Sequence, residues 1–183
     1  MTASFEDRVN SPEMRYAYQL TYSMRMLGEI GGRYQAAQDS DDLLPAMAML
    51  DAFYVHLRLV AEFLTRRTSR RDFGPAKLGA DNWITPNTDA ARRLAEYWDR
   101  ASKYVVHFGH PRVPENLEEL QAFEVSAAAL KGMAVDAFDV LEVLVARVEA
   151  KAGEGSVLTV ERLRAQLLRD ELDRSVRLLN GAT

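Results

Sequence analysis

The chain has 183 residues, 48% of them apolar and 27% charged, a balance typical of a folded protein of one domain. Its net charge of −4 excludes a globally basic nucleic-acid binder but leaves room for a local basic patch. The absence of cysteine excludes disulfides, thiol nucleophiles and cysteine-based metal centres. Because there is no basic leader and no run of about 18 apolar residues, we expect a cytoplasmic protein without a membrane partner.

Apolar residues recur at helical spacing, which predicts an all-α fold, a single bundle of four or five helices over residues 1–183. The first helix is predicted over 12–35, with Ser11 as its N-cap and Gly31-Gly32 weakening its end. The second is predicted over 40–67 and is apolar on two sides, as expected for a central helix. Its main stripe is Leu50, Tyr54, Leu57, Ala61 and Leu64, and its second stripe is Ala52, Leu59 and Phe63.

A long connecting loop is predicted over 68–87, anchored by Trp83 and Ile84. Helices follow over 88–108, where Gly109 and Pro111 end the third, and over 115–151. The C-terminal segment 156–183 contains an amphipathic helix over 159–180. The side chains expected in the core are, in the fourth helix, Leu120, Phe123, Ala127, Leu130, Val135, Phe138, Leu141, Leu144 and Val145, and in the last helix Leu163, Leu167, Leu172, Val176 and Leu179.

The helix over 88–108 has one apolar and one polar face. Leu94, Trp98, Ala101, Val105 and Phe108 fall within about 40° of one direction at 100° per residue, so they are expected to face the core. The opposite face carries Glu96, Arg100, Lys103 and His107.

Three of these polar residues suggest chemistry on phosphates. Arg100 presents a planar fork of donors suited to phosphate oxygens, and His107 titrates near neutrality and can transfer a proton. With Lys103 assisting, such groups can cleave a phosphodiester without a metal or another cofactor. The structural alternative is an ion pair between Glu96 and Arg100 on a helix end that is simply solvated.

This pattern resembles the HEPN superfamily of helical proteins. The match consists of Arg100, six intervening residues and His107 near the end of a late helix, together with Lys103-x-x-x-His107 and the earlier helix FYVHLRLVAEFL. The resemblance covers roughly residues 40–145. It implies a cleft between two protomers in which the arginine and histidine cleave RNA without metal. Many active members carry a polar residue directly after the arginine, where this chain has Ala101.

Other polar residues offer weaker candidates. Arg66, Arg67, Arg70 and Arg71 form the densest positive segment, which fits either an RNA-backbone contact or a solvated helix end. His56 and Arg58 on the second helix, and His110 after the third, would border the same cleft if the two helices pack together. Because His107 and His110 have no third ligand at useful spacing, no metal site is expected.

The last helix alternates positive and negative residues, which is typical of a salt-bridged exposed face. Its leucine side must be buried on the bundle or on a second copy, so a homodimer is expected. The leading interpretation is a metal-independent endoribonuclease, or a degenerate relative, of the toxin or antiviral-defence type with an RNA substrate. The alternatives are a non-catalytic interaction module that binds a protein partner, such as an antitoxin, or a nucleotide, and a structural assembly protein.

Overall fold

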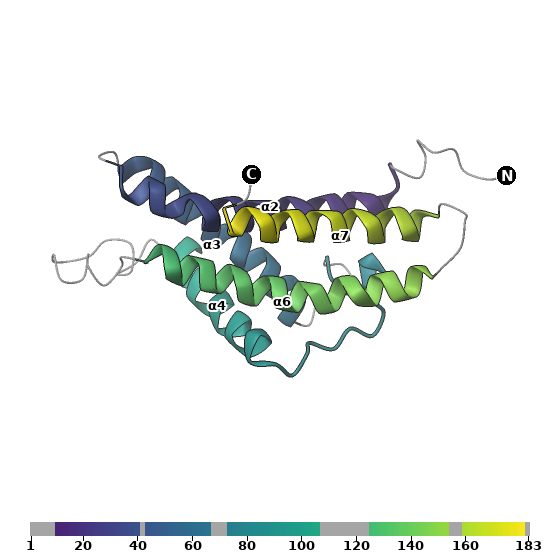
Figure 1. Ribbon diagram of the computed structural model, residues 1–183. Helices are drawn as coiled ribbons and strands as arrows, with labels where there is room; N and C mark the ends of the chain where they lie inside the picture. The colour runs from purple at the N-terminus through teal and green to yellow at the C-terminus, as the bar shows by residue number, and fades with distance from the viewer. Residues whose placement is uncertain (1–9, 41–42, 67–72, 107–124, 154–158, 182–183) are drawn as a thin grey trace.

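The computed structural model describes residues 10–40, 43–66, 73–106, 125–153 and 159–181. Within these ranges the chain forms five α-helices, one short 3-10 helix and no strand, which confirms the predicted all-α fold. The elements are α2 (Pro12–Gln38), α3 (Leu43–Thr65), η1 (Pro75–Leu78), α4 (Asp89–Val106), α6 (Ala127–Ala152) and α7 (Val160–Leu179) (Figure 1).

Serine and threonine caps set the starts of α2, α6 and α7. The Ser11 hydroxyl accepts a hydrogen bond from the Met14 amide at 3.3 Å, which confirms the predicted start of α2. Thr159 caps α7 through the Arg162 amide at 3.3 Å. Ser126 caps α6 through the Ala129 amide at 3.2 Å, so α6 begins at Ala127. The prediction had placed residues 125 and 126 inside a helix over 115–151, but they lie before α6. A side-chain oxygen at each of these positions satisfies an amide that has no partner within the helix.

The prediction that Gly31-Gly32 weakens the end of the first helix is wrong, because α2 continues to Gln38. The reason is a close contact with α7. A side chain at Gly28 would overlap the carbonyl oxygen of Ser175, and one at Gly32 would overlap that of Leu178. The glycines therefore let two helix backbones approach closely, and α7 stabilises the part of α2 that the glycines would otherwise weaken.

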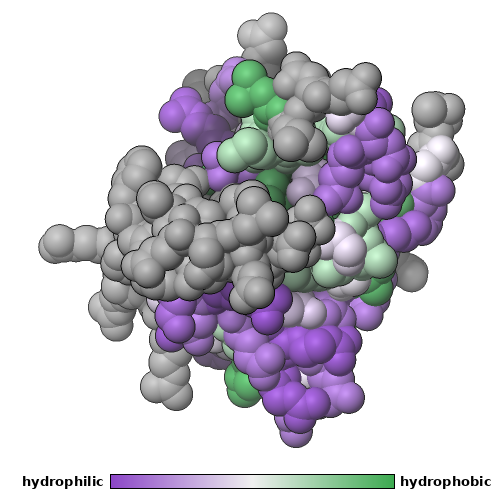
Figure 2. All heavy atoms as spheres, turned by 90° about the vertical axis from the view of Figure 1, so that its left-hand side faces the viewer, coloured by the Kyte–Doolittle hydropathy of each residue, from purple (hydrophilic) through white to green (hydrophobic). Residues whose placement is uncertain are grey.

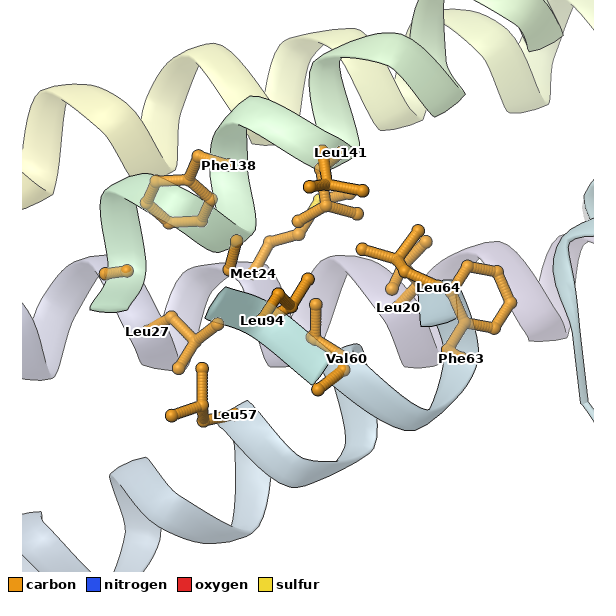
Figure 3. Close-up of a cluster of buried hydrophobic side chains, with 14 of the residues drawn as sticks. Leu20, Met24, Leu27, Leu57, Val60, Phe63, Leu64, Leu94, Phe138 and Leu141 are labelled. Atoms are coloured by element: carbon orange, nitrogen blue, oxygen red, sulfur yellow. The ribbon is translucent and has the colours of Figure 1, made fainter. Parts of the chain in front are cut away.

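The buried apolar side chains form one continuous cluster. Figure 3 shows side chains from α2, α3, α4 and α6 converging, with Met24, Leu57, Leu94 and Leu141 among them. The main stripe predicted for α3 is confirmed, since all five of its residues are buried. On α6, the prediction for Val135 is wrong: it is 42% exposed, while the next residue, Asp136, is buried.

Helix α3 is not enclosed on both sides, contrary to the prediction of a central helix. Phe63 of its second stripe is buried, but Leu59 is 45% exposed. The segment Leu44–Thr65 is long and apolar enough to cross a membrane by length and composition, a property that core helices of soluble proteins share. Its inner face belongs to the core, so the helix has one packed and one open apolar side.

The connection between α3 and α4 is anchored by hydrogen bonds to the end of α3. The Trp83 indole and the Thr85 hydroxyl both donate to the Leu64 carbonyl, at 2.8 and 2.9 Å. Trp83 is therefore an anchor as predicted, whereas Ile84 is 80% exposed and anchors nothing. At the far end of the loop, the Thr88 hydroxyl accepts a hydrogen bond from the Ala91 amide and begins α4.

Helix α7 packs on α2 and α6, running parallel to α2 (Figure 1). Its buried side is rotated from the predicted one: Leu172 and Leu179 are buried, but Val176 is 37% exposed. The idea that its charged residues only form an exposed face is also wrong. Glu171 is buried and accepts hydrogen bonds from Arg25 of α2, and the partly buried Arg169 binds Glu142 and Glu149 of α6.

Candidate functional site

Arg100 and Lys103 lie exposed on α4, on the side away from the buried Leu94 and Ala101. This placement agrees with the predicted polar face. The alternative ion pair between Glu96 and Arg100 is not formed, and among described residues no carboxylate pairs with Arg100 or Lys103. Both cations are therefore available to an external anion.

Arg100 lines a groove between α4 and α6 with a volume of about 700 Å³. The groove has charged and apolar walls. Its lining carries the cations of Arg93, Arg100 and Lys131 and the carboxylates of Glu96 and Asp136, so one positive charge is in excess. The remaining lining residues are Tyr97, Ala129, Gly132, Met133 and Val135.

Three of the lining residues, Arg93, Tyr97 and Asp136, form a hydrogen-bonded triad. Asp136 is 5% exposed and accepts hydrogen bonds from the Arg93 Nε at 2.8 Å, the Arg93 Nη2 at 2.5 Å and the Tyr97 hydroxyl at 2.8 Å. Burial and the bond to the carboxylate both raise the pKa of Tyr97, so its hydroxyl stays a donor at neutral pH. Because Arg93 and Tyr97 belong to α4 and Asp136 to α6, the triad holds the two walls of the groove together.

The charge of Arg100 also affects the pKa of a buried tyrosine. Tyr54 of α3 is buried, and burial raises the pKa of its hydroxyl, while the positive charge of Arg100 opposes that rise. The side chain of Arg100 itself is exposed.

The positive segment after α3 is described only at Arg66. Its guanidinium stacks on the Trp98 ring, 3.8 Å from the ring centroid, and pairs with Asp99 at 3.1 Å. Trp98 is half-buried and donates to Glu62. Arg66 therefore has structural partners between α3 and α4, while Arg67, Arg70 and Arg71 lie outside the described residues.

His56 and Arg58 face different helices, and neither lines the groove between α4 and α6. The His56 Nδ1 lies 3.2 Å from the Ser23 hydroxyl of α2, and its ring meets the edge of Tyr22. Arg58 instead donates to the Ser102 hydroxyl of α4 at 3.0 Å. Burial lowers the pKa of His56, which favours its neutral form.

His107 and His110 lie outside the described residues, so the structure places neither of them relative to Arg100. Among the residues that are described, no group of three or more histidine or acidic side chains is arranged to hold a metal ion.

Four charged or polar residues of the groove were not predicted from the sequence. Arg93 and Tyr97 lie seven and three positions before Arg100, a spacing that puts all three on one side of a helix. That spacing could have predicted that Arg93 and Tyr97 share a surface with Arg100. Lys131 and Asp136 had no such signal, because only the packing of α6 against α4 brings them into the groove.

Comparison with known proteins finds no counterpart: no family model, no curated protein and no solved structure matches this chain. The site is therefore interpreted from its own geometry.

Proposed function

We propose that the groove between α4 and α6 binds the phosphate backbone of RNA and that the chain is a HEPN-like, metal-independent endoribonuclease of the toxin or antiviral-defence type. The observation that carries the proposal is the pair of cations on its rim. Arg100 on α4 and Lys131 on α6 line the same groove, and neither is neutralised by another described residue. Free guanidinium and ammonium groups facing one open groove suit phosphate oxygens.

In this proposal Arg100 stabilises the charge that develops on the phosphate, and Lys103, also exposed on α4, assists. His107 follows Arg100 by seven positions in the sequence and is assigned the proton transfer. The RNA 2′-hydroxyl attacks the adjacent phosphorus and loses its proton. The bond to the 5′-oxygen breaks, that oxygen takes up a proton, and a 2′,3′-cyclic phosphate and a 5′-hydroxyl remain. The proposal places the protein in the cytoplasm, where such a substrate is present.

The test is cleavage of a labelled single-stranded RNA by the purified chain in the presence of a chelator. We expect cyclic-phosphate ends, no cleavage of the 2′-deoxy analogue, and a loss of about 10²-fold or more in rate in Arg100→Ala and His107→Ala. The matched control is Arg92→Ala, an exposed arginine of the same helix that pairs with Asp89 outside the groove. Growth and total RNA integrity in a host expressing each variant give a second readout.

A non-catalytic interaction module is the second candidate, and one observation favours it. Ala101, which stands where many active HEPN members carry a polar residue, is fully buried and offers no functional group. This function predicts binding of a protein or nucleotide partner that depends on Arg100, without any cleavage of RNA. Binding and cleavage measured on the same variants therefore separate the two functions.

A further inference from the structure

The outer side of α3 carries an apolar stripe that is largely open to solvent. At 100° per residue its members fall within about 80° of one another, on the side opposite the fully buried Leu57. They are Leu44, Ala48, Ala52, Val55 and Leu59. Leu44 is 70% exposed, and no charged residue of 44–59 falls within this arc. Figure 2 shows apolar surface at the top of the view, at the end of the bundle where α2 gives way to α3.

A groove of about 380 Å³ runs between α2 and this stripe. Its apolar lining comes from both helices and consists of Met26, Ile30, Ala48, Met49 and Ala52. Ala48 and Ala52 lie one helical turn apart and have the smallest side chains of the stripe. Larger side chains stand on either side of them along α3, Leu44 before and Val55 after. The middle of the stripe is therefore recessed, and a helix that crosses α2 and α3 can sit there.

The charged residues of the groove all come from α2. They are two arginines, Arg25 and Arg33, and one glutamate, Glu29. Arg33 pairs with Glu29 at 3.2 Å, but the Arg33 side chain is 65% exposed and that of Glu29 only 29%. The carboxylate that binds Arg25 is Glu171, which is buried, whereas the Arg25 side chain is 43% exposed. The α2 rim therefore presents an excess of positive charge to solvent and complements an acidic partner.

The recess distinguishes a helix from other occupants. A lipid surface receives protruding apolar side chains, so it would leave the space over Ala48 and Ala52 unfilled. A second copy, related by a two-fold axis centred on the groove, would set recess against recess and the two arginine rims against each other. An amphipathic helix fills a recess of this kind with apolar side chains spaced about one turn apart, and keeps its charged residues at the rim.

We infer that the groove between α2 and α3 binds a helix of a different protein, with apolar side chains at positions i, i+3 or i+4, and i+7 and with acidic residues beside them. The apolar side chains pack on Ala48, Met49 and Ala52, and the carboxylates meet Arg25 and Arg33. This groove shares no lining residue with the groove between α4 and α6, so the inference does not rest on the proposed nuclease function.

The experiment titrates the full chain into a fluorescein-labelled helical peptide that has leucines at these spacings and glutamates on its other faces. A twin peptide carries lysine in place of every glutamate. Fluorescence anisotropy gives the dissociation constant of each. We expect the acidic peptide to bind the wild type and the lysine twin to bind at least ~10-fold more weakly, because the α2 rim repels it.

Two variants locate the peptide on the chain. Ala48→Glu puts a charged side chain into the recess and should weaken binding of the acidic peptide at least ~10-fold. The matched control is Ala146→Glu, because Ala146 is also an exposed alanine within a helix and lines neither groove. Arg33→Glu should reduce the preference for the acidic peptide over its twin, whereas loss of the fold would weaken both. Circular dichroism should show equal helicity in all variants.

A second measurement maps the contact without adding charge. The chain has no cysteine, so Ala48→Cys and Ala146→Cys each introduce a single thiol. The acidic peptide should slow the reaction of a maleimide with the thiol at position 48 and leave the reaction at position 146 unchanged.

The inference fails if the acidic peptide does not bind the wild type, if the lysine twin binds as tightly, or if Ala48→Glu leaves binding unchanged. Sedimentation of the wild type, but not of Ala48→Glu, with phosphatidylglycerol vesicles would also overturn it, since the groove would then bind lipid. A thiol at position 48 that reacts more slowly as protein concentration rises, with no peptide present, would place a second copy there and would likewise overturn it.

Discussion

Arg93 on α4 binds the carboxylate of Asp136 on α6 through two parallel hydrogen bonds, and the carboxylate is almost completely buried. Removing it would leave the Tyr97 hydroxyl without its partner and the two groove walls without their link. We expect Asp136→Ala to lower the free energy of unfolding by about 1–3 kcal/mol, measured by urea denaturation. Asp139→Ala, an exposed aspartate one turn along α6, should stay within about 0.5 kcal/mol of the wild type. Equal effects at the two positions would show that the triad does not hold the helices together.

Substitution by alanine should destabilise the protein at Gly28 of α2 and stabilise it at Gly132 of α6. Gly28→Ala places a methyl group against the Ser175 carbonyl, so α2 and α7 must separate and the melting temperature should fall. A methyl group at the exposed position 132 of α6 meets nothing within 4 Å, so Gly132→Ala should stabilise the protein by about 0.5–1 kcal/mol. Thermal melts of both variants test the close packing of the two helices, and a neutral Gly28→Ala would contradict it.

His56 should make the fold less stable as the pH falls below its ordinary pKa. Burial lowers its pKa in the folded state below the ordinary value of 6.5, so the unfolded chain binds a proton that the folded chain resists. The stability that depends on neutral His56 is therefore fully present above pH 6.5 and is lost as the pH falls toward the folded-state pKa. Glu149 and Glu161, whose pKa values are lowered chiefly by hydrogen bonds, act at lower pH, below 4.5. Denaturation between pH 7.5 and 5 should show the decline in the wild type and a flatter profile in His56→Gln.

Lys131 should contribute to RNA binding through its charge alone. Each phosphate contact adds about one unit to the slope of log affinity against log salt, so Lys131→Ala should reduce that slope by ~1. Lys151→Ala is the control, because that lysine lies near the other end of α6 and pairs with Asp81. Fluorescence anisotropy with a labelled RNA at several salt concentrations gives the slope. An unchanged slope in Lys131→Ala would place the RNA elsewhere.

The local features of the fold were predictable because they depend on neighbours in the chain. Ser11 and Thr159 start helices where their hydroxyls can bind amides three residues later, and the spacing of Leu94 and Ala101 puts both on one side of α4. The same periodicity predicted that Arg100 and Lys103 would be exposed. These results need only the geometry of one helix.

Errors arose wherever a side chain's surroundings come from another helix. Gly31 and Gly32 were predicted to weaken the helix end, but α7 packs on both of them, and Glu171 was predicted to be solvated, but it binds Arg25 of α2. His56 and Arg58 are two positions apart, yet they turn to different helices.

The chain by itself therefore determined the number and phase of most helices, the start of three of them and the polar side of α4. Only the tertiary structure decided which charges are paired, which apolar face of α3 stays open, and that Arg93, Lys131 and Asp136 meet Arg100 in one groove. The physical reason is range: capping and amphipathic spacing act over three or four residues, whereas burial and ion pairing depend on residues that the fold brings together from distant parts of the chain.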